Sequence, residues 1–220
     1  MTFSILAQDL STGAFGGAAA TGSLCVGGWV LRGDSRAGLS ASQGAAPSTL
    51  WGEDALELMR QGKHAKDVLA QLTGADQGRA WRQLALLDRS GGTACHTGQR
   101  NGDWKGALVA PGLVVSGNLL AGPEVLDAMR ESYEQTHGDL ATRLLAALSA
   151  AEKAGGDTRG LQSAALLIVS DDAPPQSLRV DWAETPISAL AALHARSKSG
   201  DYAKWVPTVP TRTAPERGQD

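Results

Sequence analysis

Thr2 combines a residue type and a position that suggest covalent chemistry. Methionine aminopeptidases usually remove an initial methionine when the next residue is small, so processing would leave Thr2 with a free α-amino group. The pKa of an α-amine is about 7.7 to 8.0, so an appreciable fraction is neutral at physiological pH. The neutral amine can accept the proton of the Thr2 hydroxyl, so one residue would supply both nucleophile and base. The expected reaction is attack on an amide-type carbonyl, followed by hydrolysis of the acyl-enzyme.

Ser4 is the polar residue expected to lie closest to Thr2. Residues 2–8 are rich in β-branched and apolar types, which predicts a strand. Side-chain alternation places Thr2, Ser4 and Leu6 on one face of that strand. Ser4 would then either hydrogen-bond within an active site or bond to buried backbone. Threonine is also a common second residue, so the alternative is that Thr2 is only the first residue of a strand.

Other polar side chains stand in glycine-rich or apolar surroundings and are candidates for the same site. Asn118, in SGNLLAG, would donate to an oxyanion or stabilise a turn. His96 would be either catalytic or a structural histidine. Asp157 and Arg159, in GGDTRG, would orient a substrate carboxylate or pair with each other. The remaining candidates for substrate binding are Gln43, at an expected strand end, and Gln162 and Ser163, before an apolar run.

The usual motifs for binding phosphate or dinucleotides, for zinc proteolysis and for serine hydrolysis are absent from the sequence. Cys95 and His96 are adjacent potential metal ligands, but on a strand their side chains point to opposite faces and cannot hold one ion. We therefore expect neither a metal nor a cofactor. Cys25 and Cys95 lack the spacing of a disulfide framework, which favours free thiols in a reducing compartment.

Charge and hydropathy restrict the partners. The chain of 220 residues has 20 Lys and Arg against 23 Asp and Glu, a formal net charge of −3. A nucleic-acid-binding protein would show a basic surplus. The sequence has no apolar stretch of about 18 residues and no signal peptide at its start. We expect a cytoplasmic protein that acts on a small-molecule substrate, without nucleic-acid or membrane partners. The pattern leaves homo-oligomerisation open.

The elements that must position these residues alternate between strands and helices. Strands are expected at residues 2–8, 14–20, 24–31, 37–42, 82–89, 92–97, 107–118 (broken at Pro111-Gly112) and 163–169. Helices are expected at 48–61, from 65 to about 72 before Gly74, after Gly122-Pro123, after a cap at Asp139, and from Thr185-Pro186 to about 196.

Several of these segments carry further structural information. The small residues of 14–20 suggest close approach by another layer, and the apolar run 163–169 is typical of a strand covered on both faces. The hairpins exclude a simple βαβ alternation, so the pattern predicts an α+β fold with two stacked, mainly antiparallel sheets flanked by helices. We expect a single domain over 1–205 and a flexible C-terminal tail over 206–220, because prolines and a lack of periodicity mark that tail.

Long segments of this chain resemble the bacterial family DUF1028, which is of unknown function and is regarded as similar in fold to the N-terminal-nucleophile (Ntn) hydrolases. The resemblance spans residues 2 to about 196 and rests on TFSILAQD, GGAAATGSLCVG, RQLALLDRSGGTACHTG, SGNLLAGPEVLDAM and GGDTRGLQSAALLIV. The Gln43 segment, ASQGAAPSTLWG, differs from the stretch usual in the family. The resemblance implies a four-layer αββα sandwich. Residues that match the family's motifs are Thr2, Ser4, His96, Asn118, Asp157, Arg159, Gln162 and Ser163.

The leading hypothesis is an Ntn amidohydrolase acting on a small amide, with Thr2 as nucleophile and its α-amine as base. Ser4 and His96 would tune the site, and Asn118 would stabilise the oxyanion. One alternative is a non-catalytic ligand-binding or assembly protein on the same scaffold, since fold does not fix function. Another is an enzyme built around His96 and Asp157 with Thr2 as a bystander.

Overall fold

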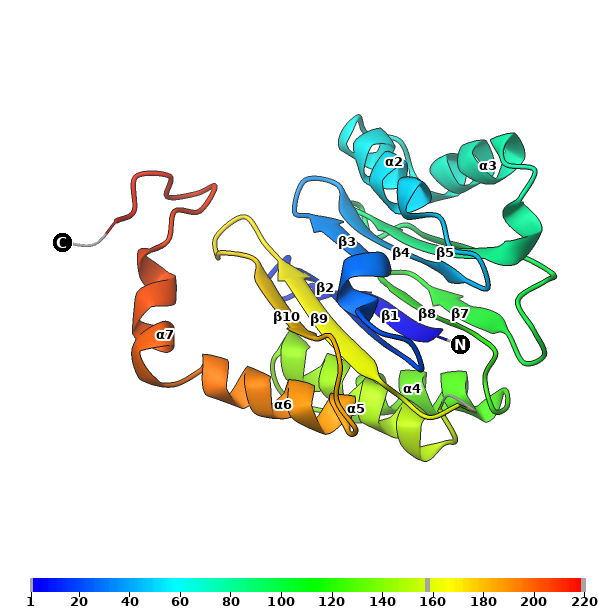
Figure 1. Cartoon of the computed structure of the whole chain (residues 1–220). Coiled ribbons are helices and arrows are strands. Elements are labelled where there is room, and N and C mark those ends of the chain that lie inside the picture. Colours follow the sequence, from blue (N-terminus) through cyan, green and yellow to red (C-terminus); the bar gives the residue numbers. More distant parts are fainter. Residues whose placement is uncertain (1, 157–158, 219–220) are drawn as a thin grey trace.

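The computed structural model describes residues 2–156 and 159–218 and contains two antiparallel sheets, one of six strands and one of four (Figure 1). The strands are β1 (Thr2–Gln8), β2 (Phe15–Thr21), β3 (Leu31–Asp34), β4 (Gly38–Gly44), β5 (Arg82–Asp88), β6 (Thr93–Thr97), β7 (Gly106–Ala110), β8 (Leu113–Asn118), β9 (Ser163–Val169) and β10 (Gln176–Val180). The helices are α1 (Val26–Trp29), α2 (Thr49–Arg60), α3 (Ala65–Ala75), α4 (Glu124–Gln135), α5 (Leu140–Lys153), α6 (Pro186–Ser197) and α7 (Gly200–Trp205), with 3-10 turns at Arg79–Trp81 and Val206–Thr208. The predicted α+β class with two mainly antiparallel sheets is confirmed.

The order of the larger sheet is β10-β9-β2-β1-β8-β7, and that of the smaller sheet is β3-β4-β5-β6. The N-terminal strand therefore lies in the middle of the larger sheet, between β2 and β8, and the first residue of β1 reaches one end of that sheet. A central strand has neighbours on both sides, so the backbone of Thr2 is held in a defined register against Thr21 and Asn118.

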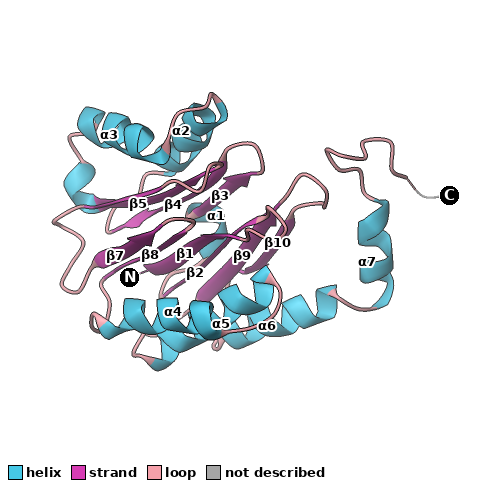
Figure 2. Cartoon of the chain, turned by 180° about the vertical axis from the view of Figure 1, so that it is seen from behind, coloured by secondary structure: helices cyan, strands magenta, loops and turns pink. Residues whose placement is uncertain are grey.

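Three clusters of apolar side chains hold the layers together. One lies between the larger sheet and helices α4, α5 and α6; the second lies between the two sheets; the third lies between the smaller sheet and helices α2 and α3. Figures 1 and 2 show the two helical groups on opposite outer sides of the paired sheets. Burial on both faces explains why the run of β9 is continuously apolar, since Leu166 belongs to the first cluster and Ala165 to the second.

The small residues of β2 allow helix α5 to approach the sheet closely, as their pattern predicts. A Cβ added to Gly16 would lie 2.7 Å from side-chain atoms of Leu140 and Leu144 in α5. A real Cβ essentially never lies within 3.0 Å of another heavy atom, so a larger residue at position 16 would force these leucine side chains or the helix to shift.

The strand predicted at 24–31 is wrong, because residues Val26–Trp29 form the short helix α1. A Cβ added to Gly27 would lie 2.8 Å from Ala165 and 2.7 Å from Arg179. The two consecutive glycines, Gly27 and Gly28, thus let the backbone of this turn lie directly on β9 and β10. Their role is close packing, whereas the sequence pattern suggested an extended segment.

Other differences lie near element ends. Helix α3 continues through Gly74 to Ala75, and nothing lies within 4 Å of a Cβ added at Gly74. An exposed helical glycine costs only about 1 kcal/mol relative to alanine, which the rest of the helix offsets. The sequence analysis also did not identify β10 or α7, which are 5 and 6 residues long.

Residues 206–218, predicted as a flexible tail, return to the body of the protein. The backbone N–H of Thr213 donates to the carbonyl of Asp171 at 3.2 Å, and Nε of Arg212 donates to the Ser35 hydroxyl at 3.1 Å. Arg212 also lies 3.7 Å from a carboxylate oxygen of Asp34. In the part of the chain that the structure describes, no helix combines the length and the apolar character needed to cross a membrane.

Candidate functional site

A row of hydroxyl and amide side chains crosses the larger sheet at one end. The strand registers place Ser163 opposite Thr21, Thr21 opposite Thr2, and Thr2 opposite Asn118. Residues directly opposite on neighbouring strands project from the same face. Leu6, four residues along β1 from Thr2, belongs to the cluster between the sheets, so this whole row faces the smaller sheet.

A second polar row faces the first from the smaller sheet. Gln43 pairs with Gln83, and Gln83 pairs with Thr97. Their neighbours two residues away, Ala41 and Ala85, belong to the apolar cluster between the sheets. The space between the sheets is therefore apolar along most of its length and polar at the end where β1 begins.

Gln83 links the two rows and is fully buried. Its Oε1 accepts hydrogen bonds from Nε2 of Gln43 at 2.7 Å and from Nδ2 of Asn118 at 3.1 Å. Its Nε2 lies within donor distance of three oxygens: the Thr97 hydroxyl at 2.9 Å and the carbonyls of Gly106 at 3.0 Å and Gly117 at 2.9 Å. One amide thus fixes the separation of the two sheets at this end.

Ser4 lies in the next polar row, behind Thr2. Its hydroxyl is 3.0 Å from that of Ser116 on β8, and Ser116 is 3.4 Å from Nε2 of Gln43. Ser4 is therefore linked, through Ser116 and Gln43, to the buried hydrogen-bonded cluster around Gln83 that also contains Asn118. It does not hydrogen-bond directly to Thr2 among the contacts of the described residues.

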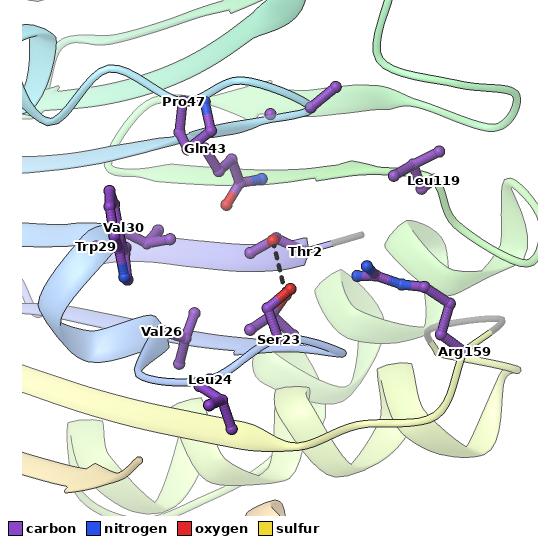
Figure 3. Close-up of a pocket in the computed structure, with 13 residues that line it drawn as sticks. Thr2, Ser23, Leu24, Val26, Trp29, Val30, Gln43, Pro47, Leu119 and Arg159 are labelled. Atoms are coloured by element: carbon purple, nitrogen blue, oxygen red, sulfur yellow. Dashed lines mark hydrogen bonds between the residues drawn. The ribbon is translucent and has the colours of Figure 1, made fainter. Parts of the chain in front are cut away.

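Thr2 lies at the border between this buried cluster and a pocket. The residue is 9% exposed, and its Oγ1 is 3.0 Å from Oγ1 of Thr21, the bond drawn as a dashed line in Figure 3. The pocket has a volume of about 350 Å³. Its lining residues are Thr2, Thr21, Ser23, Leu24, Val26, Trp29, Val30, Gln43, Gly44, Ala45, Pro47, Leu119 and Arg159.

The pocket is chemically asymmetric. Arg159 is the only charged residue among the described residues that line it. In Figure 3 its guanidinium points toward Thr2 from one side, while Trp29 and Val30 lie on the other side and Gln43 descends from the smaller sheet. Three candidates from the sequence, Thr2, Gln43 and Arg159, therefore meet at one cavity, although they are far apart in the chain.

Gln162 and Ser163 support the wall of the pocket rather than line it. The Ser163 hydroxyl donates to the carbonyl of Ser23 at 2.7 Å and accepts from the N–H of Val26 at 3.0 Å. Nε2 of Gln162 donates to the carbonyl of Gly22 at 2.8 Å. These bonds fix the loop that carries Ser23. Gln162 and Ser163 were predicted to bind substrate, but neither is among the described residues that line the cavity.

Asn101 holds the part of the pocket rim formed by Gly44 and Ala45. It is fully buried and was not predicted from the sequence. Its Oδ1 accepts from the N–H of Ala45 at 2.8 Å, and its Nδ2 donates to the carbonyls of Arg82 at 3.0 Å and Gly98 at 2.9 Å. Gly44, next to Ala45, has φ +132°, a conformation that favours glycine. A Cβ there would also lie 2.8 Å from Oδ1 of Asn101.

Leu119 has a left-handed backbone, with φ 58°, and lines the pocket directly after Asn118. Non-glycine residues rarely adopt this conformation, and such strain is often found at functional sites. The side chain of Leu119 packs against Gly102, where any Cβ would collide with it. Gly102 itself has φ +78°. The sequence does not reveal this pair, because Gly102 lies 17 residues before Leu119 in the chain.

His96 does not join the Thr2 cluster. Its partner on β5 is Leu84, which belongs to the cluster beneath helices α2 and α3. The ring packs edge-on against Trp51 of α2, and Nε2 is 3.0 Å from the carbonyl of Arg79. His96 therefore lies on the outer face of the smaller sheet and is not among the described residues that line the pocket, so the fold does not bring it to the site that it was expected to tune. The neighbouring Thr97 is the residue that faces inward and bonds Gln83.

Two buried carbonyl oxygens near Thr2 have no hydrogen-bond partner among the described residues. They are Oε1 of Gln43 and Oδ1 of Asn118, and both residues are 1% exposed. An unsatisfied buried acceptor costs about 1 to 3 kcal/mol. Two of them beside the first residue of β1 mark a place where additional N–H donors would be stabilised.

No cysteine is among the described residues that line this pocket. Burial raises the pKa of the Cys95 thiol to about 12, which opposes formation of the reactive thiolate. Within the described residues, no group of three or more His, Cys, Asp or Glu is placed to hold a metal ion. Asp157, a predicted partner of Arg159, lies outside the described residues.

Comparison with known proteins identifies the family. The model of a family of unknown function, DUF1028, matches residues 2–190. The chain belongs to DUF1028. The crystal structure of protein SPO2555 from Silicibacter pomeroyi, also described as DUF1028, is 51% identical in sequence, with a TM-score of 0.95. The match covers 100% of this chain and 99% of that one. No curated protein matches the chain.

Membership of DUF1028 agrees with the resemblance found in the sequence. The matched range 2–190 contains every described residue that lines the pocket, and it also contains Gln83 and Asn118. The 51% identity and the TM-score of 0.95 show that the SPO2555 protein shares this arrangement of sheets and helices. Because the family's function is unknown, the chemistry must be argued from the site itself.

Proposed function

We propose that this DUF1028 protein is an Ntn amidohydrolase in which Thr2, freed by removal of Met1, attacks a small amide. The observation that carries the proposal is the position of Thr2: the first residue of a central strand borders a pocket of about 350 Å³. On this proposal the paired sheets and the helices outside them form the four-layer αββα sandwich of Ntn hydrolases. The enzyme would act in the cytoplasm, as the sequence suggests.

The proposed reaction needs only Thr2, the amide substrate and one water molecule. The neutral α-amine takes the hydroxyl proton as Oγ1 bonds to the amide carbon. The tetrahedral intermediate collapses with cleavage of the C–N bond, and the ammonium returns its proton to the leaving amine. The resulting ester is attacked by water, which the α-amine deprotonates, and the acid is released. The Thr21 hydroxyl, 3.0 Å away, would orient Oγ1 of Thr2 during both steps.

The free α-amine has suitable acceptors in the structure. Oε1 of Gln43 and Oδ1 of Asn118 are buried without described partners, and Asn118 is directly opposite Thr2 in the β1–β8 ladder. An amine at position 2 has more N–H donors than the peptide N–H that it replaces. Bonding those donors to the two oxygens would remove the cost of leaving them unsatisfied. These acceptors support a processed N-terminus.

Asn118 is also the proposed oxyanion donor. One N–H of its Nδ2 goes to Gln83, and the amide nitrogen carries a second N–H. The bond to Gln83 holds the side chain in place before substrate arrives, so little reorganisation would be needed in the transition state. Ser4 would act one step further out, through its bond to Ser116, which contacts Gln43.

The test combines N-terminal mass spectrometry with an assay of amide hydrolysis. We expect purified protein to begin at Thr2, to hydrolyse small amides, and to lose at least about a thousandfold in kcat in Thr2→Ala. Thr12→Ala is the matched control, because Thr12 is exposed in the turn at the other end of β1, and it should leave kcat unchanged. Full activity in protein that retains Met1 would overturn the proposal. Ligand binding without turnover would instead support a binding protein.

A further inference from the structure

The pocket beside Thr2 places a positive group and an apolar wall on opposite sides of the candidate nucleophile. The guanidinium of Arg159 lies on one side, and Trp29 and Val30 lie on the other (Figure 3). The described residues that line the pocket include no Asp or Glu. A ligand that spans the pocket across Thr2 would therefore meet cationic and apolar environments at its two ends.

Two large side chains of the apolar wall are about half exposed, whereas Val30 is buried. Leu24 is 52% exposed and Trp29 is 53% exposed. Adjacent large apolar residues at a cavity mouth are typical of a surface that a ligand covers. The wall is also rigidly supported, since Ser163 bonds both the carbonyl of Ser23 and the N–H of Val26, on either side of Leu24. Gly27 packs directly on Ala165 beneath it.

Arginine suits a carboxylate at the other end. Its planar guanidinium can donate two parallel hydrogen bonds to the two oxygens of one carboxylate. The pocket volume of about 350 Å³ lies at the small end of the usual range for ligand sites, about 300 to 1,000 Å³. A small molecule with a carboxylate and a short apolar group would fill it.

We infer that the substrate is an N-acyl amino acid or a closely similar amide, with a carboxylate on one side of the scissile bond and an apolar group on the other. Arg159 binds the carboxylate, and Leu24, Trp29 and Val30 contact the apolar group. Two such anchors place the amide between them, over Oγ1 of Thr2, which lowers the entropic cost of reaching a reactive geometry. The inference rests on the proposed amidohydrolase function and adds the class of its substrate.

Binding tests the inference separately from turnover. Calorimetry with the Thr2→Ala protein, checked for folding by circular dichroism, compares N-butanoylglycine with its uncharged analogue N-butanoylglycinamide. We expect the acid to bind at least about tenfold more tightly, as charge-assisted hydrogen bonds imply. Adding Arg159→Gln should abolish this preference, and Arg159→Lys should keep part of it. Arg196→Gln, an equal charge change at an exposed position of α6, should leave it intact.

The apolar wall has its own comparison. In the Thr2→Ala protein, N-butanoylglycine should bind more tightly than N-acetylglycine, by about tenfold for two added methylene groups. Trp29→Ala should reduce that ratio toward one. Equal affinity for the acid and its amide, no measurable binding of either, or an acid preference that survives Arg159→Gln would each overturn the inference.

Turnover by the unmodified enzyme then separates the two proposals. Hydrolysis of N-butanoylglycine with kcat/KM at least about tenfold above that of its amide supports both. Acid-selective binding without hydrolysis supports the ligand class and overturns the amidohydrolase function. Hydrolysis of both compounds at equal kcat/KM overturns the substrate class and leaves the amidohydrolase function standing.

Discussion

The hydroxyls of Thr2 and Thr21 lie 3.0 Å apart across the β1–β2 hairpin, and both residues border the same pocket. Replacing Thr21 by valine keeps its shape and removes its hydroxyl, so Oγ1 of Thr2 loses an orienting partner. We expect Thr21→Val to lower kcat by about 10- to 100-fold at nearly unchanged stability. Steady-state kinetics and thermal unfolding measure both effects. Thr21→Ser should retain activity, and full activity in Thr21→Val would show that the bond has no catalytic role.

Gln83 is predicted to be the most sensitive polar residue between the sheets. Gln83→Met preserves approximate volume but leaves buried groups of Gln43, Asn118 and Thr97 without their partner. We expect a loss of about 3 to 5 kcal/mol in the free energy of unfolding, measured by urea titration. Gln135→Met, on the exposed end of α4, is the control and should change stability by less than about 0.5 kcal/mol. Equal effects of the two substitutions would contradict the linking role of Gln83.

Gly102 and Gly74 give a matched pair of glycine substitutions. Gly102→Ala strains a backbone with φ +78° and forces its Cβ against Leu119, so we expect a loss of more than about 1 kcal/mol and weaker ligand binding. Gly74→Ala, in an open position on α3, should gain up to about 1 kcal/mol. Thermal unfolding of the two variants measures the contrast. Unchanged stability and ligand binding in Gly102→Ala would mean that Leu119 moves aside freely, contrary to this prediction.

His194 makes stability depend on pH. Burial lowers its pKa below the ordinary 6.5, and nearby Lys198 lowers it further, while Asp139 opposes the change. The unfolded chain therefore binds a proton at a higher pH than the folded protein does. His194 contributes its full stability above about pH 6.5, and this contribution falls as the pH drops toward the folded pKa.

His194→Gln removes that titration while keeping a polar side chain on α6. Between pH 7 and pH 5, we expect the melting temperature of the unmodified protein to fall more steeply than that of His194→Gln. Parallel melting curves over this range would contradict the assigned direction of the shift. His137→Gln, an exposed histidine, should follow the unmodified protein.

Much of the fold follows from local sequence signals. The turn at 11–13 predicts a hairpin of β1 and β2, and extending its register would have placed Thr21 beside Thr2. Thr21 was missed because its own segment is dominated by alanine and glycine. The proline at the start of α6 and the Asp139 cap of α5 likewise act within one helical turn, so their positions were predictable.

The site was less predictable because the two central strands of the smaller sheet, β4 and β5, bury both faces. Alternation on β6 shows that His96 and Thr97 point in opposite directions, but not which face meets the other sheet. Gln83 carries the same ambiguity within the apolar run of β5. Only the stacking of two sheets decides that Gln83 and Thr97 face Thr2, while His96 lies under α2.

Covalent labelling tests most directly whether Thr2 is the nucleophile. A β-lactone is opened by an attacking hydroxyl and remains attached as an ester, adding its whole mass to the protein. Intact-mass measurement and peptide mapping should show protein that begins at Thr2 and carries one label on that residue, with no label on Thr2→Ala. Protein that hydrolyses amides while retaining Met1, or that carries the label on another residue, would contradict the account.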